Sequence, residues 1–142
     1  MSNSARLVFP LNEKDLSHYS IDTPPLIPLQ RNIEIQTKYD TFRSNPENSQ
    51  IFIDTIKDHI QSNKTKYYIC KNDFPYYTTH SICHYVLWMS NDLKLDKIKI
   101  NTLIKEQFDI KHYELITYWK NIEANRSIHS LKHIHLFVKQ LD

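Results

Sequence analysis

The segment KHIHLFV, residues 132–138, decides the fold of this chain. It is typical of a β-strand, on which successive side chains point to opposite faces of a sheet. The aliphatic side chains from Ile134 to Val138 then share one face, which we expect to pack against helices. His133 and His135 share the other, more open face, about 7 Å apart at a rise of roughly 3.3 Å per residue.

The rest of the chain supplies the other strands and helices that such a sheet needs. Segments rich in aromatic and β-branched residues predict three more strands, over 66–71, 82–89 and 112–119. Apolar residues at helical spacing predict helices over 32–44, 47–63 and 96–108, and the "NP" at 45 and 46 separates the first two. This order favours an α+β single domain, with an antiparallel sheet of about four strands and helices on one face.

The first 29 residues differ from the rest, because they contain prolines at positions 10, 24, 25 and 28. Proline at this density blocks helices and central strands alike. Residues 1–29 are therefore expected to form an extended, proline-rich arm over an α+β domain of residues 30–142.

Charge and hydropathy exclude several classes of function. The 142 residues carry a formal net charge of +2, and the lysines are scattered singly, as on a solvated face. We therefore expect no general binding to nucleic acid. No apolar run approaches the roughly 20 residues of a membrane span, and the chain begins without the apolar block of a signal peptide. A soluble, intracellular protein of the cytoplasm is predicted, with no membrane partner.

The composition also limits the chemistry of a site. The chain has no glycine, which excludes the glycine-rich, phosphate-cradling loops of Walker and Rossmann motifs. Cys70 and Cys83 have neither a CxxC spacing nor a histidine at ligand spacing, so reduced thiols are expected rather than a zinc site or a disulfide. Richness in Asn, Lys, Ile and Tyr is typical of an AT-rich genome, such as that of a large DNA virus or an AT-rich protist.

Histidines are the main candidates for function. His84 lies in the strand predicted over 82–89, and His129 lies just before His133 and His135, so up to four imidazoles can converge. Such a cluster can bind a transition metal, supply a nucleophile and its partner for phosphate-ester chemistry, or line a pocket without chemistry. A structural alternative also stands, in which the pair holds the 120–131 loop through backbone carbonyls.

Three blocks of the chain, from about residue 29 onward, resemble one fungal family. They are LQRNIEIQTKYDTFR (29–43), DFPYYTTHSICHYVLW (73–88) and YWKNIEANRSIHSLKHIHLFV (118–138). They look like the signature blocks of the fungal N-acetylglucosamine-induced protein family, for which no biochemical function is established. The matching positions are Arg31, Tyr39, Phe74, Pro75, Tyr76, His84, Trp88, Trp119, Asn121, Ser127, Ile128, His133 and His135. The chain departs from the family pattern at Ile122, where the family tends to have proline.

The last block is also similar to the histidine-rich block of the histidine-triad nucleotide hydrolases and transferases. This resemblance implies a histidine-triad-like fold, again an antiparallel sheet with helices. It places His135 at the nucleophilic middle histidine, His133 at the first, Ser130 at the serine and His129 at the glutamine that contacts phosphate. Phe137 stands at the third histidine position, and the glycine-rich turn is absent. Both departures count against catalysis, because the third histidine helps to set the protonation of its neighbours and the glycines let the backbone approach phosphate closely.

These observations lead to one hypothesis for the site, with alternatives. We expect a pocket bordered by His84, His133, His135 and the 120–131 loop, which binds or hydrolyses a small phosphorylated or sugar-like ligand. In an enzyme, His135 would act as nucleophile or base and His133 as its electrostatic partner. The ligand-binding candidates are His84, His129, Ser127, Ser130, Asn121, Arg31, Tyr76 and Trp88. A non-catalytic interaction or ligand-sensing module and a metal site on His84, His133 and His135 stay open, and neither a cofactor nor an oligomeric state is indicated.

Overall fold

The computed structural model of the chain describes residues 8–126 and 128–141. The elements in this part of the chain are α1 (Glu13–Leu16), α2 (Ile33–Ser44), α3 (Pro46–Ser62), β1 (Tyr67–Lys71), β2 (Ile82–Met89), α4 (Lys97–Gln107), β3 (Tyr113–Trp119), the short 3-10 helix η1 (Glu123–Asn125) and β4 (Lys132–Gln140). Every helix and strand predicted from residue 32 onward is present, with ends displaced by at most two residues.

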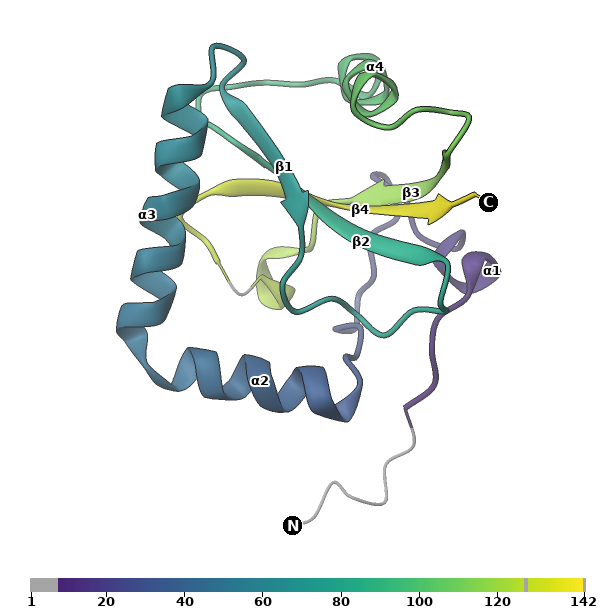
Figure 1. Ribbon diagram of the computed structural model, residues 1–142, viewed down its shortest axis with the longest axis horizontal. Coiled ribbons are helices and arrows are strands. Elements are labelled where there is room, and N and C mark those ends of the chain that lie inside the picture. The colour runs from purple at the N-terminus through teal and green to yellow at the C-terminus, as the bar shows by residue number, and fades with distance from the viewer. Residues whose placement is uncertain (1–7, 127, 142) are drawn as a thin grey trace.

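The four strands form one antiparallel sheet in the order β1-β2-β4-β3 (Figure 1). The last strand of the chain, β4, is therefore an inner strand between β2 and β3. The register places His84 of β2 opposite Phe137 and Trp88 opposite His133. The predicted α+β domain with an antiparallel sheet is confirmed.

One face of the sheet packs against α4. Ile134 and Val138 of β4 share a core with Ile100 and Ile104 of α4, and all four side chains are buried. Full burial of each such side chain contributes roughly 1.5–3 kcal/mol. This is the aliphatic face that the alternation in β4 predicts.

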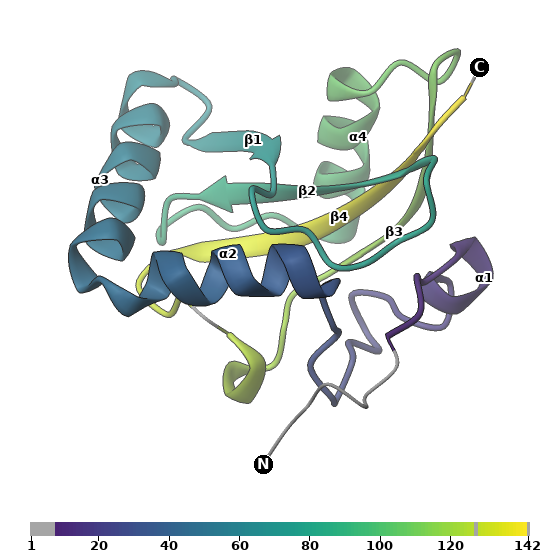
Figure 2. The same ribbon diagram turned by 60° about the horizontal axis from the view of Figure 1, so that its bottom comes forward.

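The opposite face, which carries His133 and His135, is covered as well. Ile56 and Ile60 of α3 pack against Trp88 of β2. Figure 2 shows α4 on one side of the sheet and α2 on the other. The helices thus lie over both faces rather than over one, because the histidine-bearing face also carries apolar side chains that need cover.

Residues 8–29 lie against β3 and the loop before β2. The backbone N–H of Thr79 donates to the carbonyl of Leu11 at 2.9 Å, and the Thr117 hydroxyl donates to the carbonyl of Tyr19 at 2.6 Å. The segment includes α1, which the proline content did not predict. A capping box between Asn12 and Asp15 begins this helix. The division between arm and domain at residue 29 stays a prediction.

The break between α2 and α3 has a local cause. Asn45 accepts a hydrogen bond from the backbone N–H of Glu47, and Pro46 occupies the first turn of α3. Proline is favoured there because its missing N–H has no helical partner at that position. The predicted break is confirmed, and it turns α3 away from α2 (Figure 1).

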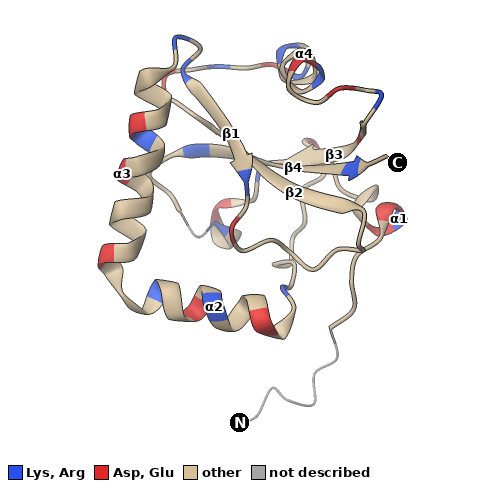
Figure 3. Ribbon diagram, in the orientation of Figure 1, with Lys and Arg blue, Asp and Glu red and all other residues tan. Residues whose placement is uncertain are grey.

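Charged residues are distributed over the surface without a strong block of one sign. Acidic and basic residues alternate along α2 in Figure 3. Cys70 and Cys83 are both free thiols. Within residues 8–126 and 128–141, no helix is long and apolar enough to cross a bilayer.

Candidate ligand-binding site

A cavity of about 420 Å³ lies against the histidine-bearing face of the sheet. Val86, Trp88, His133 and His135 of the inner strands form one wall, and residues of α2 and α3 face them. Its size falls within the roughly 300–1,000 Å³ of small-molecule sites. We call this space the histidine cavity.

Aromatic rings form much of the wall that α2 and the loop after β1 contribute. The ring of Phe74 lies 5.3 Å from that of Tyr39 and 5.2 Å from that of Phe42. Tyr76 lies over His135, with ring centroids 5.6 Å apart. Such walls suit a planar or partly apolar ligand.

His84 and His135 are hydrogen-bonded to each other, with 2.8 Å between Nε2 of His84 and Nδ1 of His135. They are diagonal neighbours, because His84 lies opposite Phe137 in the register. Their side chains are buried, with 4% and 7% exposed. His135 lines the histidine cavity, whereas His84 lies behind it and lines a smaller neighbouring cavity of about 350 Å³.

Both rings are neutral at pH 7. Burial lowers the pKa of His84 to about 3, and the positive charge of Arg31 acts in the same direction. Burial also lowers the pKa of His135 well below 6.5, and the neighbouring imidazoles and Arg31 add to that effect. A neutral imidazole has one N–H donor and one acceptor nitrogen.

The partners of His84 fix where these protons lie. Donors face both ring nitrogens of His84: the backbone N–H of Tyr76 lies 3.2 Å from Nδ1, and Nδ2 of Asn72 lies 3.5 Å from Nε2. The closer donor is the one that His84 accepts from, which places the proton of His84 on Nε2. That proton is donated to Nδ1 of His135, so the proton of His135 is on its own Nε2. The pair therefore turns the cavity-lining nitrogen of His135 into a donor.

Asn121 stands beside that donor. Its Oδ1 accepts from the indole N–H of Trp119 at 2.9 Å, and its Nδ2 donates to the hydroxyl of Tyr76 at 3.0 Å. The same Nδ2 lies 3.2 Å from Nε2 of His135. Trp119 holds the amide in this orientation, because a flipped amide would set its NH₂ group against the indole N–H.

His133 and Trp88 add one acceptor and one donor. Nδ1 of His133 lies 2.9 Å from the carbonyl of Leu131 and donates to it, which leaves Nε2 of the neutral ring as an acceptor. Burial lowers the pKa of His133, although the Leu131 carbonyl opposes this shift. The indole N–H of Trp88 is buried and has no oxygen or nitrogen acceptor in the described residues, and its partner there is the sulfur of Cys70, a weak acceptor. The bond to Leu131 is of the kind that the structural alternative predicted, but it is formed by His133 alone, since the hydrogen-bond partners of His135 are the side chains of His84 and Asn121.

The cationic end of the histidine cavity is built around Tyr39. The guanidinium carbon of Arg31 lies 4.0 Å from the Tyr39 ring centroid, and that of Arg43 lies 5.6 Å away. Nε of Arg31 donates to the carbonyl of Phe74 at 2.7 Å. In the described part of the chain, neither arginine forms an ion pair with a carboxylate. Arg31, Arg43 and Lys71 line the cavity against one carboxylate, Asp73, so its wall is net positive.

A metal site on His84, His133 and His135 does not fit this geometry. His84 and His135 use their facing nitrogens on each other, and His133 uses Nδ1 on a backbone carbonyl. Among residues 8–126 and 128–141, no three His, Cys, Asp or Glu side chains are arranged to hold a metal ion.

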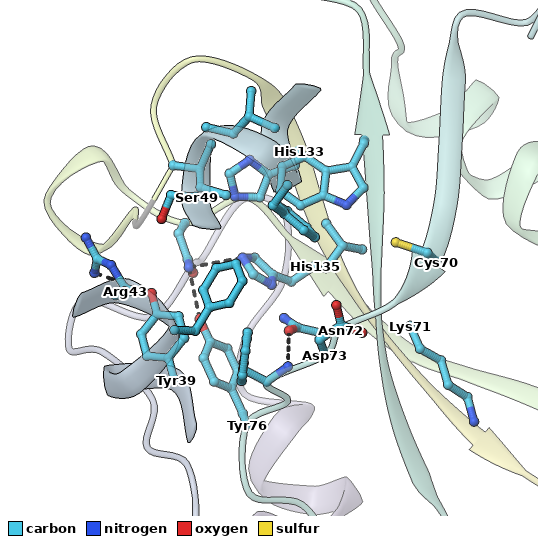
Figure 4. Close-up of a pocket in the computed structure, with 18 of the residues that line it drawn as sticks. Tyr39, Arg43, Ser49, Cys70, Lys71, Asn72, Asp73, Tyr76, His133 and His135 are labelled. Atoms are coloured by element: carbon cyan, nitrogen blue, oxygen red, sulfur yellow. Dashed lines mark hydrogen bonds between the residues drawn. The ribbon is translucent and has the colours of Figure 1, made fainter. Parts of the chain in front are cut away.

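Most residues singled out from the sequence meet at the histidine cavity. Its lining includes Arg31, Tyr76, Trp88, Asn121, His129, Ser130, His133 and His135. His129 and Ser130 are exposed. Ser127 lies outside the described residues. Figure 4 shows His133 and His135 next to each other, with Tyr39 and Arg43 to one side and Asn72 and Asp73 to the other.

Sequence reasoning missed several lining residues, including Arg43, Phe52 and Asn72. Arg43 had a usable signal, since it follows Tyr39 by four positions on one helix and so shares its face. Asn72 carried no such signal, because its role depends on where the chain leaves β1: its Oδ1 accepts from the N–H of Phe74 at 2.8 Å.

Comparisons with known proteins agree on a family and on a fold. A family model described as "Protein of unknown function (DUF3605)" matches residues 15–139. N-acetylglucosamine-induced protein 1 of Candida albicans is 28% identical over 104 residues, which cover 63% of this chain and 41% of that protein. The match thus spans well under half of the relative's length. The resemblance to the N-acetylglucosamine-induced proteins is confirmed, and the one to the histidine-triad enzymes stays a prediction.

A solved structure described as the crystal structure of HTC1 shares the fold. The superposition covers 80% of this chain and 77% of that one, with a TM-score of 0.51 and 18% sequence identity. At this identity the likeness concerns the fold alone.

Proposed function

This chain belongs to the DUF3605 family of proteins of unknown function, and we propose that it binds a small anionic ligand in the histidine cavity without hydrolysing it. The observation that carries the proposal is the pair of guanidinium groups beside Tyr39, neither of which has a carboxylate partner in the described residues. A phosphate or carboxylate group of a ligand supplies the missing charge, and arginine suits both through paired hydrogen bonds.

The histidines support binding more than nucleophilic catalysis. A nucleophile needs a free lone pair facing the ligand. The Nδ1 lone pair of His135 accepts the hydrogen bond from His84, and its Nε2 carries the proton. His135 is therefore assigned as a hydrogen-bond donor to the ligand, in place of the nucleophile expected from the histidine-triad resemblance.

The walls match an anion that also has a planar or sugar-like body. Aromatic rings line the space between the arginines and the sheet. The buried indole N–H of Trp88 has no oxygen or nitrogen acceptor in the described residues, and the sulfur of Cys70 is only a weak acceptor, so an oxygen of a ligand is a better partner for it. Phosphorylated sugars and nucleoside monophosphates combine these features. The relative's printed name, which refers to induction by N-acetylglucosamine, supports testing amino-sugar phosphates among them.

A protein-interaction surface built from the conspicuous aromatic residues has less support. Tyr76, Trp88 and Trp119 are 8%, 4% and 0% exposed, so they have little surface to offer a partner.

The test is a thermal-shift and calorimetric titration with glucose 6-phosphate, a nucleoside monophosphate and inorganic phosphate. A ligand present at a hundred times its Kd adds about 2.7 kcal/mol to the stability of the folded state. Arg43→Gln should weaken binding roughly tenfold or more, because hydrogen bonds to charged groups contribute about 1.5–3 kcal/mol.

Lys38→Gln is the matched control, since it removes one cation from the same helix at an exposed position outside the cavity lining. Its affinity should equal that of the wild type. If both substitutions lowered the affinity equally, binding would depend only on the net charge of the protein, and the proposed site would be wrong.

A further inference from the structure

Two N–H groups in the wall of the histidine cavity meet with no acceptor between them among the residues that the structure describes. They are Nε2–H of His135 and Nδ2–H of Asn121, whose nitrogens lie 3.2 Å apart. Both side chains are buried, each with 7% of its surface exposed. A buried donor without an acceptor costs about 1–3 kcal/mol.

No choice of tautomer removes this surplus. Moving the proton of His135 to Nδ1 would set it against Nε2–H of His84, at the 2.8 Å contact. Moving the proton of His84 as well would set it against the backbone N–H of Tyr76, at the 3.2 Å contact. With both rings neutral, the row from Tyr76 to Asn121 always holds one donor too many.

An oxygen with two lone pairs, reached from the cavity, resolves the conflict by accepting from both donors. A carbonyl oxygen has this capacity, and it carries no proton that would compete. His133 supplies an acceptor close to these two donors. Its ring centroid lies 5.4 Å from that of His135, and its Nε2 is free to accept because Nδ1 donates to Leu131. The wall therefore presents donors and an acceptor side by side.

We propose that the histidine cavity selects anions that carry a secondary amide, with the carbonyl oxygen on His135 and Asn121 and the amide N–H on His133. This inference rests on the proposed function, because it specifies a second group of the anion that binds there. Two kinds of molecule share this chemistry: an N-acylated sugar phosphate, and a nucleotide whose base presents a carbonyl next to an N–H.

Paired ligands separate the two sources and test the inference on the unmodified protein. N-acetylglucosamine 6-phosphate is compared with glucose 6-phosphate, which has a hydroxyl in place of the acetamido group. Uridine monophosphate is compared with cytidine monophosphate, in which the donor and acceptor on the pairing edge of the base are exchanged. Isothermal titration should show at least about tenfold tighter binding of the amide-bearing member in one of the pairs.

The outcomes are distinct. A tenfold preference in either pair supports the inference and names the source. Binding of all four ligands within about threefold would overturn the amide inference while the anion proposal stands. Absence of binding by all four would overturn both.

One variant tests the donors themselves. Asn121→Asp replaces the NH₂ group by a carboxylate oxygen, which accepts the His135 proton and removes the surplus. The preference for the amide-bearing ligand should then fall to about threefold or less, and because the readout is a ratio of affinities, general repulsion of anions cancels.

Asn125→Asp is the control, because it makes the same change on η1 outside the cavity lining, and it should keep the full preference. An unchanged ratio in Asn121→Asp, in protein shown to be folded by circular dichroism, would contradict the inference.

Discussion

Nε2 of His84 lies 2.8 Å from Nδ1 of His135, and this contact joins a strand residue that does not reach the histidine cavity to one that does. Through it, the backbone N–H of Tyr76 determines which nitrogen of His135 carries a proton. The two histidines thus work as one unit: the inner ring, His84, determines which nitrogen of the cavity-lining ring, His135, carries the proton.

Removing the inner ring should destabilise the fold. His84→Leu leaves both the Tyr76 N–H and Nδ1 of His135 without partners in a buried place. We expect a loss of about 1–3 kcal/mol in the free energy of unfolding, measured by urea denaturation. His80→Leu, at an exposed position two residues before β2, is the control and should stay within about 0.5 kcal/mol of the wild type. Equal stability of His84→Leu and the wild type would argue against the pairing.

Acid should weaken the protein through the same residue. The pKa of His84 is about 3 in the folded state and about 6.5 in the unfolded chain, so the unfolded state binds more protons between these pH values. The contribution of His84 to the free energy of unfolding is therefore fully present above pH 6.5. It falls by about 1.4 kcal/mol per pH unit as the pH drops toward 3.

The measurement compares urea denaturation of the wild type and His84→Leu at several pH values. The stability advantage of the wild type should shrink as the pH falls below about 6.5, because the variant lacks this titrating group. Titrating carboxylates affect both proteins and cancel in the difference. A difference that stays constant from pH 7.5 to 4.5 would show that His84 is not held neutral.

Phe137→His tests the resemblance to the histidine-triad enzymes, since it restores the third histidine. Phe137 is 0% exposed, and its ring lies 4.6 Å from that of Trp119 and 4.5 Å from that of His84. A polar ring there should cost about 2–4 kcal/mol and bring no hydrolysis of a chromogenic phosphodiester. Phe137→Leu, which changes volume without adding a polar atom, should cost less. Hydrolysis by Phe137→His above the rate of the wild type would instead place the chain close to those enzymes in mechanism.

Much of the fold could be predicted because each strand and long helix carries its own periodicity. The apolar alternation in β4 specified the face that packs on α4. The helices that cover the histidine-bearing face were harder to predict. His133 and His135 are read as polar positions in the hydrophobic pattern of the sequence, although their rings are buried in the fold. The four-residue helix α1 was missed since it depends on a capping box and on the complete burial of Leu16 by tertiary packing.

The sequence could indicate several of the residues that line the histidine cavity, but it could not indicate the hydrogen bonds among them. The sequence indicates that His84 and His135 lie on strands, whereas their hydrogen bond depends on a register that sets His84 opposite Phe137. The role of Asn121 depends on the Trp119 indole that orients its amide. Such contacts depend on tertiary packing, and the spacing of residues along the sequence does not reveal them.

The tautomers of the buried histidines test the account most directly. Long-range ¹H–¹⁵N correlation spectra of the wild type at pH 7, assigned with His84→Leu and His135→Leu, report which nitrogen of each ring carries the proton. We predict a proton on Nε2 of His84 and on Nε2 of His135. A proton on Nδ1 of His135, or a charged ring at either position, would contradict it.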